Sequence, residues 1–145
     1  MAKLTPNAKK EIFAHFKDFQ TIHLATHDGK SPRVRPVTLA YLDGRFWVLT
    51  GSGDAKMRQL ARDPSFEFCL MLEKKKERGT LRASGRARIV RDRKTKASVA
   101  GKVPWFSNYW KDPGHQGYGL IGLDVSAIEY MRPGEMESEK YVMGK

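Results

Sequence analysis

The sequence predicts a mainly β protein, in which antiparallel strands are flanked by helices. β-prone stretches recur along the whole chain. Asp-Gly pairs at 28–29 and 43–44 separate neighbouring stretches, and this dipeptide is typical of the tight turns of antiparallel hairpins. The stretch 80–90 alternates apolar and polar residues, as a strand does when one face of its sheet packs on a core and the other meets water.

A chain of 145 residues is long enough to bury a core as one domain, and no shift in composition marks a boundary. We therefore expect a single domain over 1–145, with peripheral tails at 1–6 and 133–145. The hydrophobic and charged contents, 40% and 30%, are those of a soluble globular protein. The chain has no apolar run that would span a membrane, no signal-peptide core and one cysteine, Cys69, so we expect it in the cytoplasm.

The formal net charge of +11 has three competing explanations: a nucleic-acid footprint, a site for an anionic ligand, or solubility alone. The basic residues are spread along the chain, with small clusters at 74–76 and 86–96. This dispersion favours solubility together with a local anion site over a dedicated nucleic-acid groove.

The remaining elements follow from periodicity and end signals. A first helix is expected over 5–17, because Thr5 suits the N-cap, Pro6 suits the first helical position and apolar residues follow at helical spacing. Two further helices are expected over 54–62 and 93–102. The expected strands are 21–26, 33–42, 45–49, 65–72, 80–90, 117–125 and 126–131.

The strand 33–42 places Arg33 and Arg35 on one face. Pro36 removes a hydrogen-bond donor in the middle of this strand, so the sequence predicts an edge or a bulge there. Two arginines beside such an irregular edge could present charge to a ligand, and they could equally be solvated.

The segment TGSGDAK, residues 50–56, joins a strand to the start of a helix. Free backbone N–H groups and the helix dipole at such a start favour an anion, and Thr50, Ser52 and Lys56 add polar groups. The alternative is an ordinary connection in which Asp54 caps the helix and Lys56 is solvated. The segment alone favours the ordinary connection.

Four aromatic side chains fall within the six residues 105–110, next to proline and glycine. Such a segment suits a cover for a flat ligand or a contact between subunits, and the alternative is a loop pinned to its own core. We favour a ligand lid or a subunit contact.

Several chemistries find no support in the sequence. The four histidines, at 15, 23, 27 and 115, lack cysteine partners at metal-site spacing, so we expect no metal site. The nucleotide-binding glycine motifs and the nucleophile elbow of hydrolases are absent. Cys69 is expected to be a half-buried, inert thiol, and no residue stands out as a catalytic acid or base.

Taken in order, these segments resemble the pyridoxamine 5′-phosphate oxidase-like family of flavin-binding split β-barrels, and within it the general-stress-protein branch. The likeness covers roughly residues 7–132 and rests on the ordered set rather than on one motif. The matching segments are IHLATHDGKSPRVRPV, FWVLTGSGDAKMRQLARDPSFEF, RGTLRASGRARIV and WFSNYWKDPGHQGYGLIGLDVSAIEYM. The resemblance implies a six- to seven-stranded antiparallel split β-barrel.

The resemblance also implies flavin mononucleotide (FMN) bound between the two subunits of a homodimer. Basic residues of the second strand and the lysine at the helix start hold the phosphate in this family; here these are Arg33 or Arg35, with the better register at Arg35, and Lys56. Thr80 stands where relatives often carry a glutamine facing the ring. The implied cofactor residues are Arg33, Val34, Arg35, Pro36, Val37, Leu49, Thr50, Ser52, Lys56, Thr80, Trp105 and Trp110.

The sequence departs from the family pattern at three places. Asp54 replaces a serine that contacts phosphate in relatives, and Thr80 is shorter than glutamine. The chain ends soon after Tyr130, without the segment that completes the site of true pyridoxamine phosphate oxidases, so we expect no vitamin B6 oxidation. We expect a flavin-dependent oxidoreductase acting on a small molecule that the sequence does not identify.

Two alternatives stay open. In the first, a basic barrel binds single-stranded nucleic acid through arginines of the strand 80–90 and the aromatic segment 105–110. This alternative is less favoured, because it leaves the ordered family pattern unexplained. The same fold could also hold heme or a deazaflavin in place of FMN.

Overall fold

The computed structural model describes residues 1–143, which form eight β-strands, three α-helices and one short 3₁₀ helix. The elements are, in order, β1 (Ala2–Lys3), α1 (Pro6–Phe13), β2 (Phe19–His27), β3 (Pro32–Leu42), β4 (Arg45–Gly51), α2 (Ala55–Arg62), β5 (Ser65–Lys74), β6 (Glu77–Ile89), α3 (Arg93–Ala100), η1 (Phe106–Asn108), β7 (Tyr118–Met131) and β8 (Glu139–Val142).

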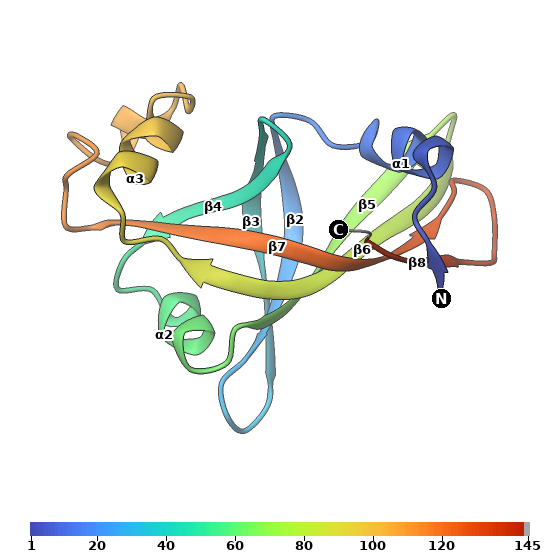
Figure 1. Ribbon diagram of the computed structural model, residues 1–145, viewed down its shortest axis with the longest axis horizontal. Coiled ribbons are helices and arrows are strands. Elements are labelled where there is room, and N and C mark those ends of the chain that lie inside the picture. Colours follow the sequence, from blue (N-terminus) through green and yellow to red (C-terminus); the bar gives the residue numbers. More distant parts are fainter. Residues whose placement is uncertain (144–145) are drawn as a thin grey trace.

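The sheet is an antiparallel barrel with a two-strand extension. Strand order is β1-β8-β7-β4-β3-β2-β5-β6, and β6 pairs again with β7, so that β2 to β7 close a ring of six strands. Figure 1 shows the long β7 crossing the molecule, with α3 at one end and α1 near the other. The mainly β split barrel with flanking helices is therefore confirmed.

The two tails take part in the sheet at its edge. β1 pairs in parallel with β8, and β8 pairs with the end of β7 through Ala127 to Tyr130. Pro133 and Gly134 interrupt the chain between β7 and β8. Residues 144–145 of the expected tail lie outside the described residues.

The β3–β4 hairpin turn and two of the helix starts have the geometry that their local sequence predicts. Asp43 and Gly44 both have positive φ, 51° and 75°, in the two-residue turn between β3 and β4. The Thr5 side chain accepts a hydrogen bond from the Ala8 N–H at the start of α1, and the Asp92 side chain does the same for Thr95 at α3.

Two predicted helix ends were wrong. The first helix ends at Phe13 rather than at residue 17, because the Gln20 side chain accepts from the Lys17 N–H and donates to the His15 carbonyl, which holds the following turn out of helical geometry. The third ends at Ala100 rather than at 102.

The two expected final strands are one strand, β7, with a bulge instead of a break. Gly85 of β6 pairs with Val125 and Ser84 pairs with Ala127, which leaves Ser126 as the extra residue. A Cβ at Gly85 would lie 1.9 Å from the Asp124 carbonyl oxygen, so this close crossing requires glycine.

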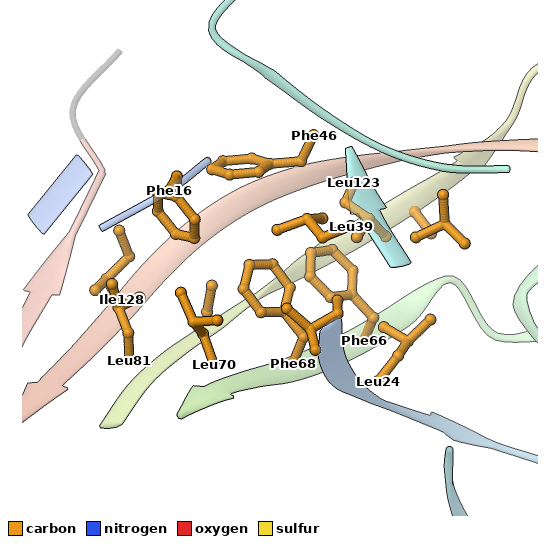
Figure 2. Close-up of a cluster of buried hydrophobic side chains, with 14 of the residues drawn as sticks. Phe16, Leu24, Leu39, Phe46, Phe66, Phe68, Leu70, Leu81, Leu123 and Ile128 are labelled. Carbon is orange, nitrogen blue, oxygen red and sulfur yellow. The ribbon is translucent and has the colours of Figure 1, made fainter. Parts of the chain in front are cut away.

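The barrel interior holds the main core. Figure 2 shows its phenylalanines gathered among strands that are far apart in sequence. Phe46 lies 4.8 Å from Phe16 and 5.9 Å from Phe68, measured between ring centroids, so the segment after α1 closes this core. The expected inward face of β5, from Phe66 to Leu72 at alternate positions, is buried here as predicted.

A second core lies on the outer face of β4 and β7, beneath α3 and η1. It is built around Trp47, Val99, Phe106, Tyr118 and Leu120. The outer face of β3, β2, β5 and β6 lies elsewhere on the barrel and carries exposed apolar side chains.

Candidate functional site

The β3–β4 ladder opens part-way along the barrel. Its pairing runs only from Leu42–Arg45 to Ala40–Trp47. Beyond that point β3 continues with β2 while β4 continues with β7, and Figure 1 shows the two strands diverging from their shared turn. Because each strand keeps a partner on one side only, backbone groups on the other side face the opening.

Register identifies those groups. The Tyr41 N–H donates toward β2, to the Asp18 carbonyl, so in an extended strand the Thr38 N–H and carbonyl point the opposite way, into the opening. The Ser52 N–H donates toward β7, so Leu49 and Gly51 likewise point into the opening. Pro36 is two residues before Thr38, so its backbone nitrogen also faces the opening. Its missing N–H therefore removes no hydrogen bond to a neighbouring strand, and the predicted edge at Pro36 is confirmed.

A cleft of about 520 Å³ occupies the opening. Its volume lies in the range of small-molecule and cofactor sites. Both faces of the separated strands contribute to it, because side chains pointing into and out of the barrel are exposed where the ladder opens. The lining residues are Val37, Thr38, Val48, Leu49, Thr50, Gly51, Asp54, Lys56, Trp105, Tyr109 and Trp110.

The aromatic segment forms one wall of this cleft. Phe106 is buried and packs edge-on against Tyr118, with 4.8 Å between ring centroids, which anchors the segment in the second core. Trp105, Tyr109 and Trp110 then line the cleft, and Tyr109 is 69% exposed. The segment is thus both pinned to its own core and presented to a ligand site.

The TGSGDAK turn closes the other end of the cleft. The Lys56 ammonium lies 3.1 Å from Asp54 Oδ2, and the lysine side chain is only 13% exposed. The same carboxylate oxygen accepts hydrogen bonds from the Thr50 hydroxyl at 2.6 Å and the Gly51 N–H at 3.2 Å. Asp54 therefore holds the N-cap position of α2 without capping it through its side chain.

This arrangement leaves the start of α2 open. The N–H groups of Ala55 and Lys56 have no hydrogen-bond partner among residues 1–143. The Thr50 hydroxyl, and after it Lys56, holds the pKa of the Asp54 carboxyl below its usual value, so Asp54 is ionised at neutral pH. A negative group thus stands beside the polar end of the cleft.

The two arginines of β3 are engaged elsewhere. Arg33 Nε donates to Asp28 Oδ2 at 2.7 Å. The Arg35 guanidinium donates to Thr26 Oγ1 at 2.8 Å, to Gln59 Oε1 at 2.9 Å and to the Leu24 carbonyl at 3.2 Å. Neither side chain lines the cleft.

The other expected site residues fall into two groups, those that line the cleft and those that do not. Val37, Leu49, Thr50, Lys56, Trp105 and Trp110 are brought together in the cleft. Ser52 is not a lining residue, and its hydroxyl donates to the Gln116 carbonyl at 2.7 Å. Val34, Pro36 and Thr80 lie outside the lining; Thr80 pairs with Met71 and Met131, toward the first residues of β6.

Five lining residues, Thr38, Val48, Gly51, Asp54 and Tyr109, were not in the expected cofactor set. The first three follow from where the ladder opens, and Pro36 was the only sequence signal of that opening. Within the described residues, no group of three or more His, Cys, Asp or Glu side chains gathers as a metal site would require.

Comparison with known proteins identifies the family. The family model described as pyridoxamine 5′-phosphate oxidase matches residues 8–132. The chain belongs to the pyridoxamine 5′-phosphate oxidase family. No match was found among curated protein sequences.

Solved structures of this family's fold are similar over nearly the whole chain. A NimC/NimA family protein from Clostridium acetobutylicum has a TM-score of 0.76 at 19% identity, covering 95% of this chain and 94% of its own. General stress protein 26 from Bacillus anthracis has a TM-score of 0.70 at 20% identity, with coverages of 91% and 97%. Identities this low establish the fold alone.

A heme-binding protein from Mycobacterium smegmatis is also similar, with a TM-score of 0.74 at 15% identity. The match covers 98% of this chain and 60% of that longer one.

None of the helices in the described part of the chain has the length and hydrophobicity of a membrane span.

Proposed function

We propose that the chain binds FMN in the cleft at the β3–β4 opening and works as a flavin-dependent oxidoreductase on a small molecule. The observation that carries this proposal is the opened ladder. It presents unpaired backbone groups of Thr38 and Leu49 beside an aromatic wall, and it ends at a lysine on a helix start.

A flat isoalloxazine ring suits such a slot. Its polar edge requires hydrogen-bond donors and acceptors, which separated strands supply without side chains. Its faces are apolar, and Trp105 and Trp110 offer aromatic surface on one wall. The bound flavin would carry the hydride chemistry, while the protein binds and orients it.

The phosphate is assigned to the Lys56 end. Suitable partners for a phosphate are the Lys56 ammonium and the free N–H groups of Ala55 and Lys56. The Ser52 hydroxyl joins them only if it releases the Gln116 carbonyl. Asp54 repels the same group, so Lys56 must exchange its contact with Asp54 for the phosphate. Arg35 joins this site only if it releases Gln59 and Thr26.

Two alternatives fit the structure less well. Arg82 pairs with Glu67 and Glu129, and Arg88 pairs with Asp124, so these arginines are not free to track a nucleic-acid backbone. Heme iron takes histidine, cysteine, methionine or tyrosine as axial ligand, and of these only Tyr109 lines the described cleft. A deazaflavin would fit the same slot, and titration separates it from FMN.

A homodimer is part of the proposal. The outer face of β3, β2, β5 and β6 exposes Val34 at 69% and Met71 at 57%, which favours cover by a second copy of the chain. Thr80 is next to Met71 on this face, so it would reach a cleft only as Thr80 of the partner subunit. Cys69, half-buried on the same face and without a disulfide, suits a reducing cytoplasm.

The test compares FMN with riboflavin, which lacks the phosphate. Both ligands are titrated by flavin fluorescence quenching and by the shift in melting temperature, with Lys56→Ala beside the wild type. Loss of a charged contact predicts FMN affinity tenfold or more weaker and riboflavin affinity within about twofold. Lys94→Ala, which removes a lysine outside the cleft, serves as the matched control.

Two outcomes would contradict the proposal. Colourless protein that neither quenches added FMN nor gains thermal stability does not bind the cofactor. Equal losses for FMN and riboflavin in Lys56→Ala mean that Lys56 does not contact the phosphate.

A further inference from the structure

A second groove lies on the other side of the first turn of α2. It has a volume of about 400 Å³ and runs between α2 and the β2–β3 turn. Its lining residues are His27, Asp28, Gly29, Ala55, Arg58, Gln59, Arg62 and Asp63. The four helical members are spaced i, i+3, i+4 and i+7, so one face of α2 forms one wall of the groove.

The glycine of the hairpin turn brings the two walls together. Gly29 has φ of 98°, and a Cβ built there would lie 3.7 Å from Arg62 Nη2. The guanidinium of Arg62 therefore sits directly against the backbone of the β2–β3 turn.

The carboxylates of the groove are already satisfied by local partners. Asp28 accepts from the backbone N–H groups of Lys30 and Ser31, at 2.8 and 2.9 Å, and from Arg33 at 2.7 Å. Asp63 accepts from the Ser65 N–H at 3.1 Å, and the pKa of each carboxyl is lowered chiefly by these backbone bonds. Neither is within ion-pair distance of Arg58 or Arg62.

The arginines of the groove consequently lack anionic partners. Arg58 Nη1 donates to the Gly53 carbonyl at 2.5 Å, and the other N–H groups of this guanidinium have no acceptor among residues 1–143. Arg62 makes no hydrogen bond or ion pair within residues 1–143. Guanidinium groups bind phosphate oxygens through paired N–H donors, and two of them facing one groove favour that ligand.

A third guanidinium lies behind the groove. Arg35 donates to Gln59 Oε1, and Gln59 is itself a lining residue. All three acceptors of Arg35 are neutral, and burial lowers its pKa. A partly buried cation without a counter-ion is stabilised when an anion binds nearby, so Arg35 adds to the preference of this groove for negative charge.

We propose that this groove is a second ligand site, which binds the phosphate group of a small molecule other than the cofactor. Arg62 and Arg58 would be its direct ligands, with Arg35 contributing charge through Gln59. The site shares only the first turn of α2 with the cofactor cleft, since Ala55 lines the groove while Asp54 and Lys56 line the cleft.

Calorimetric titration of the full chain with pyrophosphate, at fixed ionic strength, tests the proposal. We expect saturable binding by the wild type and at least fivefold weaker binding by Arg62→Gln. Arg78→Gln is the matched control, because it removes the same charge from an exposed residue at the start of β6, which does not line the groove. Circular dichroism confirms that each variant is folded.

The cofactor site supplies the cross-check. Lys56→Ala should weaken FMN binding and leave pyrophosphate binding within about twofold of wild type. Arg62→Gln should weaken pyrophosphate binding and leave FMN binding within about twofold. Equal pyrophosphate binding by Arg62→Gln and wild type, or no binding by wild type, overturns the proposal. Loss of pyrophosphate binding in FMN-saturated protein also overturns it, because the groove would then be the phosphate end of the cofactor site. Pyrophosphate binding without FMN binding would contradict only the proposed cofactor.

Discussion

Asp54 Oδ2 lies 3.1 Å from Lys56 Nζ and accepts further hydrogen bonds from Thr50 and the Gly51 N–H. One carboxylate oxygen thus gathers the donors that a phosphate would use at this end of the cleft. The protein carries an internal competitor for its proposed ligand. The strength of the cofactor contact depends on how readily Lys56 leaves this carboxylate.

Asp54→Asn should therefore tighten FMN binding. Asparagine keeps an acceptor oxygen for Thr50 and removes the charge that repels phosphate, so we expect affinity to rise about five- to tenfold, which corresponds to ~1 kcal/mol. Riboflavin affinity should stay within about twofold, as measured by fluorescence quenching. Weaker FMN binding would show instead that Asp54 positions Lys56 for the ligand.

Trp105→Ala should produce the opposite pattern to Lys56→Ala. The indole lines the cleft in which we propose that the flavin ring binds, and stacking of a base on an aromatic side chain contributes about 1–3 kcal/mol. We expect FMN and riboflavin to lose affinity equally, by roughly tenfold. A loss confined to FMN would place Trp105 at the phosphate rather than at the ring.

Phe68→Ala should be strongly destabilising. Phe68 is fully buried and lies between Phe66 and Phe46 in the barrel core. Removing a buried phenylalanine costs about 3–5 kcal/mol, which urea unfolding measures directly. Tyr109→Ala, at a 69% exposed position, is the control and should change the unfolding free energy by less than about 1 kcal/mol.

Val34→Glu should dissociate the proposed dimer. A carboxylate on the exposed face of β3 would be desolvated against the second copy, so sedimentation velocity should show monomer where the wild type shows dimer. Met136→Glu is the matched control, because Met136 is 93% exposed in the loop between β7 and β8. A monomeric wild type contradicts the dimer, and a dimeric Val34→Glu variant moves the interface elsewhere.

Acid should weaken the contact between α1 and the end of β7. The Arg132 guanidinium, 2.6 Å from Glu11, keeps the pKa of that carboxyl below its ordinary value of 4.5. Because the folded pKa is the lower one, this stabilisation is present above pH 4.5 and is lost as pH falls through the folded pKa.

Melting temperatures measured from pH 7 to pH 3 check this expectation. The difference between wild type and Glu11→Gln should shrink as the pH falls below about 4.5. Glu73→Gln, which removes the charge of an exposed residue of β5, provides the control variant. A constant difference for Glu11→Gln would show that its charge is unimportant.

Much of the fold was predictable, because the signals that set it are local. Alternation fixed the inward face of β5, and the Asp43-Gly44 turn fixed the β3–β4 hairpin. The continuity of β7 could not be predicted, since the bulge at Ser126 depends on the approach of Gly85 from a strand far away in sequence. The pairing of β8 depends in the same way on where β7 ends.

The candidate site was predictable only in outline. Thr50 and Lys56 follow from the turn before α2, and the aromatic wall follows from composition. The orientation of Arg35 did not, because Gln59 and Thr26 reach it only when α2 packs beside β2. Asp54 suits an N-cap by sequence, but Thr50, Gly51 and Lys56 together offer it more donors than the helix start does.

The early end of the β3–β4 ladder also affects how the barrel moves. Amide hydrogens of Thr38 and Leu49 have no strand across from them, so we expect them to exchange with solvent deuterium faster than those at Ala40 and Trp47. A bound ring would take the place of the missing strand and slow that exchange. Cofactor supply would then set how long the folded barrel survives proteolysis, which ties the protein's lifetime to the availability of its ligand.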